Sequence, residues 1–271
     1  MEIVLQDETF KQLRDFIYEK VGIFIPDTKK YFLANKLLTR IRDENLRSFE
    51  DYLYLVKYSA NGSELSRLYD SITTNETFFF REPQQFDVLF NFVLPEITGM
   101  KKTKKIKLWS AACSTGEEAY TIVMMCAEKK PDIRMDVFAS DISDAVLASA
   151  MKGVYNSYSV RNVPELYLKK YFRSHDQNYE LDASVKNAVK FMSINLTDEK
   201  IMKSMCDMDV IFCRNVLIYF DDKAKQKVVS LLYDSLRPGG VLFTGSTESL
   251  HNITRAFKPT ITNKVIVYRR T

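Results

Sequence analysis

The sequence predicts an α/β fold: an open, mostly parallel, Rossmann-like sheet, preceded by a helical domain and interrupted by a small antiparallel β insert. Three observations predict it. Residues 105–141 read as strand, turn of small residues, helix and second strand, which is the first half of a nucleotide-binding sheet. Residues 1–74 carry apolar side chains at helical spacing. A Pro-Gly-Gly turn at 238–240 precedes a late strand.

Residues 1–74 are expected to form the helical N-terminal domain. The first helix has an apolar stripe with one residue per turn, Phe10, Leu13, Ile17 and Val21. Gly22 ends that helix. Further helices are expected over 31–42, from Ser48 onward and over 64–72.

The second of these helices has a basic side. Its cations are Lys29, Lys30, Lys36, Arg40 and Arg42, with Arg47 just beyond the helix. Such a side is either an ordinary solvated surface or a docking surface for an acidic partner. The residues alone leave both interpretations open.

Residues 75–98 are expected to link this domain to the sheet. Their start, Phe78-Phe79-Phe80-Arg81, is more aromatic than a plain linker. Either the phenylalanines bury in a core and Arg81 caps a carboxylate, or the segment closes over a ligand and presents Arg81 to a substrate anion. A helix over 86–93 is expected to follow and to end at Pro95.

The sheet domain, residues 99–271, opens with the strand Ile106–Ala112 and a turn of small residues that ends at Gly116. A helix beginning at Glu117 and stopped by Pro131 follows. A second strand then ends at Asp141. Ligands of open parallel sheets bind beyond the carboxyl ends of the strands, and we expect Gly116 to let the backbone approach a ligand there.

The chemistry expected at this edge is that of a nucleoside without phosphates. Asp141 lies 25 positions after Gly116, near the spacing at which an acid binds both hydroxyls of a ribose. The turn has one glycine where a pyrophosphate site uses three, and Glu117 and Glu118 follow where a phosphate site needs bare N–H groups. S-adenosylmethionine fits this pattern, with its cationic end near Glu117. A Rossmann-like domain for another ligand is the alternative.

The chain after Asp141 continues the sheet with one interruption. A helix over 143–151 precedes the insert, which we place at 168–192, with Tyr179–Leu181 and Val189–Met192 as its two short strands. Residues 193–196 are expected to resume the edge of the main sheet.

The remaining sheet elements follow in order. A strand over 208–213 ends at Arg214-Asn215, and a helix over 222–236 leads to the strand 241–244 and a terminal strand over 264–268. A hairpin at the end suits a seven-stranded sheet with one antiparallel edge strand.

Composition narrows the class of protein. The 271 residues are 46% hydrophobic and 27% charged, as in a globular protein. No apolar run approaches the roughly 20 residues needed to span a bilayer, and the N-terminus lacks the pattern of a signal peptide. We therefore expect a cytoplasmic protein without membrane insertion, with reduced cysteines. His175 and His251 have no neighbouring ligand set, so no metal site is expected, and a net charge of +4 does not argue for nucleic acid.

Five motifs together closely resemble the CheR family, the S-adenosylmethionine-dependent methyltransferases of bacterial chemotaxis receptors. They are TTNETFFFRE (73–82), SAACSTGEE (110–118), ASDIS (139–143), CRNVLIYF (213–220) and PGGVLFTGSTE (238–248). The resemblance covers nearly the whole chain. It implies a class I methyltransferase sheet and an enzyme of chemosensory adaptation, which converts glutamates on the cytoplasmic helices of methyl-accepting receptors to methyl esters and releases S-adenosylhomocysteine.

The resemblance also implies roles for individual residues. Those matching the family's cofactor contacts are Asn75, Thr77, Arg81, Glu117, Asp141, Asn195, Leu196, Arg214 and Asn215. Asp141 matches the ribose acid, and Asn195 with Leu196 the pair beside the adenine. Arg81 and Tyr219 match the two residues nearest the transferred methyl. Without the resemblance, Tyr219 could equally be a core aromatic.

One departure concerns the partner. The family's insert docks a receptor pentapeptide tether with the help of a glycine-containing loop, whereas residues 173–178 contain no glycine. We therefore expect a tether-independent enzyme that finds receptors through the basic helix around Lys29–Arg47. A monomer is expected as well. The alternatives are a non-catalytic S-adenosylmethionine-binding signalling adaptor and a methyltransferase for nucleic acids or small molecules. The motif RNVLIY, which is not the Asn-Pro-Pro-aromatic type used on bases, disfavours the last.

Overall fold

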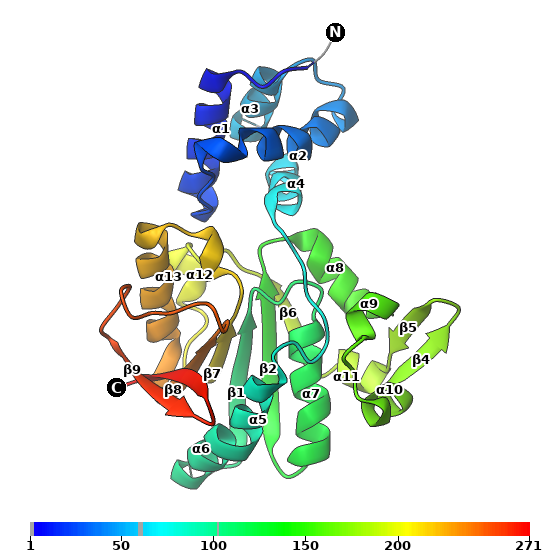
Figure 1. Ribbon diagram of the computed structural model, residues 1–271, viewed down its shortest axis with the longest axis vertical. Helices are drawn as coiled ribbons and strands as arrows, with labels where there is room; N and C mark the ends of the chain where they lie inside the picture. Colours follow the sequence, from blue (N-terminus) through cyan, green and yellow to red (C-terminus); the bar gives the residue numbers. More distant parts are fainter. Residues whose placement is uncertain (1–2, 59–61, 102) are drawn as a thin grey trace.

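The structure is a computed structural model that describes residues 3–58, 62–101 and 103–271. Figure 1 shows a helical domain stacked above one edge of a sheet domain, with a small antiparallel sheet at the side. None of the helices in the described ranges has both the length and the apolar character needed to cross a membrane.

The N-terminal domain consists of the predicted helices. They are α1 (Asp7–Val21), α2 (Lys30–Asp43), α3 (Phe49–Tyr58) and α4 (Ser63–Ile72), with a 3-10 turn at Asp27–Lys29. Their apolar faces form one core around the fully buried side chains Leu13, Ile17, Leu33, Leu37 and Ile41. The predicted stripe of α1 is confirmed, and the helix boundaries lie within two residues of the expected ones.

A buried ion pair joins α2 to α4. Glu64 is 3% exposed, and its carboxylate accepts hydrogen bonds from the Arg40 guanidinium at 2.7 and 2.9 Å and from the Tyr52 hydroxyl at 3.0 Å. Arg40 therefore belongs to the interior of the domain, and not to the solvated side of α2.

The segment after the linker does not stop at Pro95, so that prediction is wrong. Helix α5 (Pro83–Val88) continues through a π turn at Leu89–Val93 into α6 (Leu94–Met100). In the wide turn, Leu94 N–H donates to the carbonyl of Leu89. Pro95 comes directly after it, in the first turn of α6.

The main sheet has seven strands in the order β6-β2-β1-β7-β8-β10-β9. Their bounds are β1 (Lys105–Ala111), β2 (Arg134–Asp141), β6 (Val189–Ser193), β7 (Met208–Cys213), β8 (Leu236–Thr244), β9 (Phe257–Thr262) and β10 (Val265–Arg270). Strands β1, β2, β6, β7 and β8 run parallel to one another, and β10 is antiparallel to β8 and β9. The expected antiparallel strand thus lies one position inside the edge, because β9 forms the outer half of the terminal hairpin.

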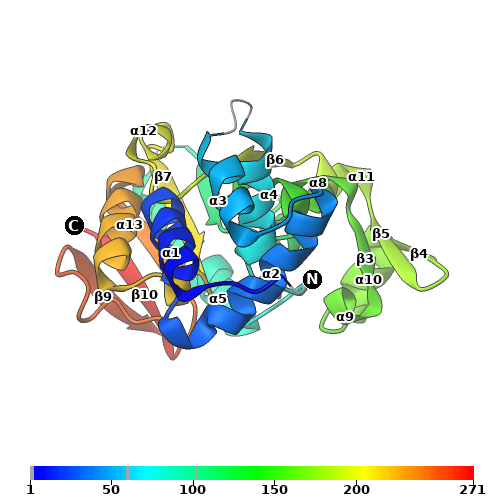
Figure 2. The ribbon, with the colours of Figure 1, turned by 90° about the horizontal axis from the view of Figure 1, so that it is seen from above.

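Helices cover both faces of this sheet (Figure 2). One face packs against α5, α6, α7 (Glu117–Lys129) and α8 (Asp144–Lys152), and the other against α12 (Glu199–Met202) and α13 (Asp222–Ser235). Alternate residues of each central strand point to opposite faces, so Phe212 lies in one core and Ile211 in the other. The Pro-Gly-Gly residues form a bulge within β8, since Met208 pairs with Leu236 whereas Val210 pairs with Val241.

The small sheet differs from the prediction. Its strands are β3 (Val154–Asn156), β5 (Asn178–Leu181) and β4 (Phe172–His175), in that order, surrounded by α9 (Ser157–Val160), α10 (Glu165–Tyr171) and α11 (Ala183–Lys186). The predicted pairing of 179–181 with 189–192 is wrong, because Val189–Ser193 is the parallel edge strand β6 of the main sheet. Residues 194–196 follow that edge strand and do not form it. An edge strand with one covered face has the same alternation as a hairpin strand, so periodicity could not separate them.

The two domains meet at several places, one of which is a short seam of hydrogen bonds around Ile23. Ile23 forms an isolated antiparallel bridge with Phe220, and Phe24 N–H donates to the carbonyl of Tyr219 at 2.9 Å. Asn195 Nδ2 donates to the carbonyl of Lys20 at 2.7 Å. These contacts hold the helical domain over the carboxyl ends of the strands.

Gly22 makes this seam possible. Its φ is +72°, and a Cβ there would lie 2.8 Å from Thr197 Cγ2. We expect Gly22→Ala to lower the free energy of unfolding by about 1–3 kcal/mol in urea titrations. Gly62→Ala is the matched control, because Gly62 has a φ of +63° with no described atom within 4 Å of an added Cβ. Equal losses in both variants would show that the close approach at the seam contributes nothing.

Candidate active site

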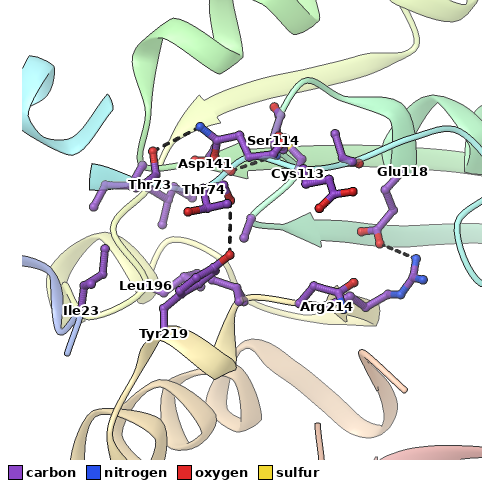
Figure 3. Close-up of a pocket in the computed structure, with 18 of the residues that line it drawn as sticks. Ile23, Thr73, Thr74, Cys113, Ser114, Glu118, Asp141, Leu196, Arg214 and Tyr219 are labelled. Atoms are coloured by element: carbon purple, nitrogen blue, oxygen red, sulfur yellow. Dashed lines mark hydrogen bonds and ion pairs between the residues drawn. The ribbon is translucent and has the colours of Figure 1, made fainter. Parts of the chain in front are cut away.

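A hollow opens at the carboxyl ends of β1, β2 and β7, beneath the helical domain (Figure 3). It encloses about 1080 Å³ when the space open to solvent is included, and its lining comes from both domains, as expected for a concave ligand site. The sheet order reverses direction between β1 and β7, which is where open α/β sheets bind ligands.

Nine of the ten predicted site residues line this hollow. They are Asn75, Thr77, Arg81, Asp141, Asn195, Leu196, Arg214, Asn215 and Tyr219. They come from the linker, from the ends of β2 and β7, and from the loop after β6, so the fold brings together segments far apart in the sequence. The tenth, Glu117, lies outside the lining.

Asp141 is a buried carboxylate held by the backbone. It is 7% exposed, and its two oxygens accept hydrogen bonds from Ser114 N–H at 2.9 Å and Ser143 N–H at 3.1 Å. Burial raises the pKa of Asp141 above the usual aspartate value, and these two N–H groups oppose the rise. Each carboxylate oxygen keeps acceptor capacity toward the hollow, which suits a pair of hydroxyl donors.

The glycine of the small-residue turn lies outside the lining of the hollow and packs closely against α7 and α8, so its approach to a ligand stays a prediction. Gly116 has a φ of +91°, and a Cβ there would lie 3.0 Å from Ala150 and from the Tyr120 ring. The turn instead meets the hollow through Ala112, Cys113 and Ser114.

Arg214 is charge-neutralised within the protein. Its side chain is 3% exposed, and its guanidinium contacts Glu118 at 2.8 Å and Glu82 at 3.0 Å. It also donates to the carbonyl of Arg81 at 2.8 Å. Arg214 therefore fixes the linker against the strand ends and has little charge left for a ligand.

Arg81 differs from Arg214 in having no acidic partner among the described residues. Its guanidinium donates to the carbonyl of Glu76 at 3.0 Å and lies 5.7 Å from the centre of the Phe78 ring. It is half-buried and lines the hollow. Tyr219, also half-buried, reaches the hollow from the other side, with its hydroxyl 3.5 Å from the carbonyl of Thr74. The site thus has one guanidinium available for an incoming anion.

Glu117 and Glu118 face different ways at the start of α7. Glu117 is buried, its carboxylate accepts from the Thr115 hydroxyl at 2.7 Å, and burial raises its pKa. Glu118 lines the hollow and pairs with Arg214. Sequence reasoning did not assign Glu118 a role of its own. The available signal was its position next to Glu117, in the first turn of a helix that starts at the site.

The helical domain also contributes to the lining, which no sequence motif indicated. Val21 and Ile23 lie at the hollow together with Ile142 and Ile194 from the sheet domain. These apolar side chains suit the flat face of a base. The cofactor expected from the sequence therefore fits the residues present, with a carboxylate for the ribose and apolar side chains for the adenine. The lining carries three carboxylates and two guanidiniums, and this balance favours a cationic ligand over a phosphate.

Comparison with known families gives the class first. Residues 75–266 match the family model described as "CheR methyltransferase, SAM binding domain", and residues 8–73 match "CheR methyltransferase, all-alpha domain". The protein is an S-adenosylmethionine-dependent methyltransferase. More narrowly, the chain belongs to the CheR family.

Individual relatives agree. "Chemotaxis protein methyltransferase 2" of Vibrio cholerae is 39% identical over 94% of this chain and 90% of its own length. "Chemotaxis protein methyltransferase" of Escherichia coli is 33% identical over 94% of this chain and 89% of its own. The solved magnesium protoporphyrin IX methyltransferase of Synechocystis is 11% identical over 100% of each chain with a TM-score of 0.39, a level that says nothing about activity.

We expect Asp141→Ala to weaken S-adenosylhomocysteine binding at least 100-fold in titration calorimetry. Two hydrogen bonds to a charged group contribute about 1.5–3 kcal/mol each, and every 1.4 kcal/mol is a factor of about ten. Asp136→Ala removes a carboxylate from the same strand, where Asp136 pairs with Lys105, and should leave the affinity unchanged. Normal binding by the Asp141 variant would refute the ribose assignment.

Proposed function

We propose that this protein is a protein-glutamate O-methyltransferase, which forms glutamyl methyl esters on the cytoplasmic helices of methyl-accepting chemotaxis receptors. One observation carries the proposal: Arg81 and Tyr219 both line the hollow that Asp141 also lines. No described carboxylate neutralises the charge of Arg81. An anionic side chain is the substrate that such a site attracts.

The chemistry requires orientation more than proton transfer. A glutamate side chain has a pKa of about 4.3 in water, so it is already ionised at neutral pH and needs no general base. S-adenosylmethionine supplies, when bound, a methyl group on a good leaving group, the sulfonium. Holding two reacting groups in line contributes about 7–11 kcal/mol at best.

Arg81 and Tyr219 are the residues that we assign to this orientation. The planar guanidinium of Arg81 can hold the incoming carboxylate by two parallel hydrogen bonds. Its stacking on Phe78 and its bond to the Glu76 carbonyl restrain it. The Tyr219 hydroxyl bonds only weakly to Thr74, so it is free to turn toward the same carboxylate.

For the cofactor we assign Asp141 to the ribose and the start of α7 to its cationic end, where Glu118 lines the hollow and the predicted Glu117 lies outside the lining. Asn195 and Leu196 lie beside the adenine in this assignment. The Asn195 amide is already engaged, because Nδ2 donates to Lys20 and Oδ1 accepts from Thr197. Its contact with adenine is therefore assigned to its backbone.

The basic side of α2 has fewer cations without an acidic partner than the sequence suggested. Lys30 pairs with Asp7 and Arg40 with Glu64. The cations of this region for which the described residues offer no carboxylate are Lys29, Lys36, Arg42 and Arg47. Lys29 and Lys36 flank the ring of Phe32, at 5.9 and 5.5 Å. We propose this remaining cluster as the contact for acidic receptor helices.

The insert supports recognition without a pentapeptide tether. His175 pairs with Asn178, so the loop expected over 173–178 is a tight hairpin with only Asp176 and Gln177 at its tip. Asp176 adopts a positive φ of 52° in place of a glycine. The division into 1–74, 75–98 and 99–271, the monomeric state and the cytoplasmic location stay predictions.

We expect Arg81→Ala to lower the rate of methyl transfer about 10–100-fold, because a hydrogen bond to a charged group contributes about 1.5–3 kcal/mol. Transfer of labelled methyl to a receptor fragment as base-labile ester measures it, and calorimetry should give an S-adenosylhomocysteine affinity within a few-fold of wild type. Arg134→Ala, at the opposite end of β2, is the control. Absence of ester formation by the wild-type enzyme would instead favour a cofactor-binding adaptor.

We also expect receptor affinity to fall with ionic strength and to be independent of the terminal pentapeptide, since exposed charges are screened by salt. Lys29→Glu with Lys36→Glu should weaken binding of a receptor fragment at least ten-fold at low salt. Lys258→Glu with Lys264→Glu makes the same charge change at the far edge of the sheet and should not. Micromolar binding of the isolated pentapeptide would overturn the tether-independent mode.

A further inference from the structure

A second buried carboxylate lies behind the site. Glu248 is 7% exposed and follows β8 after a short turn. Its Oε2 accepts hydrogen bonds from Asn215 N–H at 2.7 Å and Gly245 N–H at 2.8 Å, and its Oε1 from Ile218 N–H at 3.3 Å. Among the described residues no cation pairs with it. Backbone N–H groups alone hold this charge.

Two of those N–H groups belong to the segment after β7 that lines the hollow. Asn215 follows β7 and has a positive φ of 58°, which costs a non-glycine residue about 1–3 kcal/mol unless its surroundings hold it. Ile218 lies in the 3-10 turn Leu217–Tyr219. Gly245 follows β8. Glu248 therefore ties the ends of two neighbouring strands to the turn that carries Tyr219.

Packing around the carboxylate is tight. A Cβ on Gly245 would lie 2.7 Å from Glu248 Oε2 and 2.9 Å from Asn215 Nδ2. The Thr244 hydroxyl donates to the carbonyl of Glu248 at 2.8 Å, which fixes the backbone of Glu248 as well. An added methyl group at Gly245 would therefore displace the carboxylate from its N–H donors.

We infer that Glu248 is the positioning residue for the methyl-transfer side of the site: it holds Asn215 and Tyr219 where the cofactor and the substrate carboxylate meet. The inference rests on the proposed function. Glu248 itself does not line the hollow, so it acts through the turn. Tyr219 is thereby held from two sides, by Glu248 through Ile218 and by Phe24 through its own carbonyl.

The isosteric variant Glu248→Gln tests this, because both oxygens accept from N–H groups and an amide must place its NH₂ against at least one of them. We expect kcat to fall at least ten-fold, and amide hydrogen exchange over residues 214–219 to become at least ten-fold faster. The exchange measurement needs no substrate. Gly245→Ala should give the same pair of effects through displacement of the carboxylate, and serves if the first variant folds poorly.

Asp209→Asn is the matched control. Asp209 is a fully buried carboxylate at the other end of β7, where Lys101 and Arg237 pair with it. The Asp209→Asn substitution should lower the melting temperature without changing kcat of the folded enzyme or amide hydrogen exchange over residues 214–219. An active wild type with equal kcat and exchange in Glu248→Gln overturns the inference alone. A wild type that forms no ester overturns the proposed function, while the exchange result still decides whether Glu248 holds the turn.

Discussion

Buried carboxylates held by main-chain N–H groups organise both sides of this site. Asp141 bonds to the backbone of Ser114 and Ser143 at the end of β2, and Glu248 to that of Asn215 and Gly245 beyond β7 and β8. A charge out of water is tolerated only when hydrogen bonds replace its hydration. Each carboxylate therefore restrains the conformation of the loop whose N–H groups it accepts from.

The two arginines of the hollow divide structural and chemical roles. Arg214 is enclosed by Glu118 and Glu82, and removing one partner of such a pair would leave an uncompensated buried charge. Arg81, bonded to Arg214 through its own carbonyl, keeps its charge toward the hollow. The neutralised Arg214 thus holds the backbone of Arg81, whose guanidinium is not neutralised. The site can therefore attract an anion although the lining around the cofactor has no net positive charge.

The sequence was informative wherever local pattern and strand ends decide the structure. Asp141 was predicted because a strand end at the carboxyl edge of a parallel sheet has one possible location, whereas Arg214 was assigned through the family resemblance. Glu118 and Glu248 were not predicted, since their partners depend on side-chain direction and on contacts 96 and 33 residues away. The assignment of 189–192 to the insert failed because edge strands and hairpin strands share one periodicity. Helix continuation through Pro95 depends on a π turn, for which no residue pattern in the chain is a signal.

The seam at Ile23 and Phe24 has a consequence for how this architecture can be altered. The carbonyl of Tyr219 accepts its hydrogen bond from a residue of the helical domain, and Val21 and Ile23 form part of the same hollow. A chimaera that grafts another recognition module onto this sheet would have to transplant the segment from Lys20 to Phe24 with it. The two domains are separate along the chain but line the same hollow, so a change in the residues of one domain at this surface alters the site of the other.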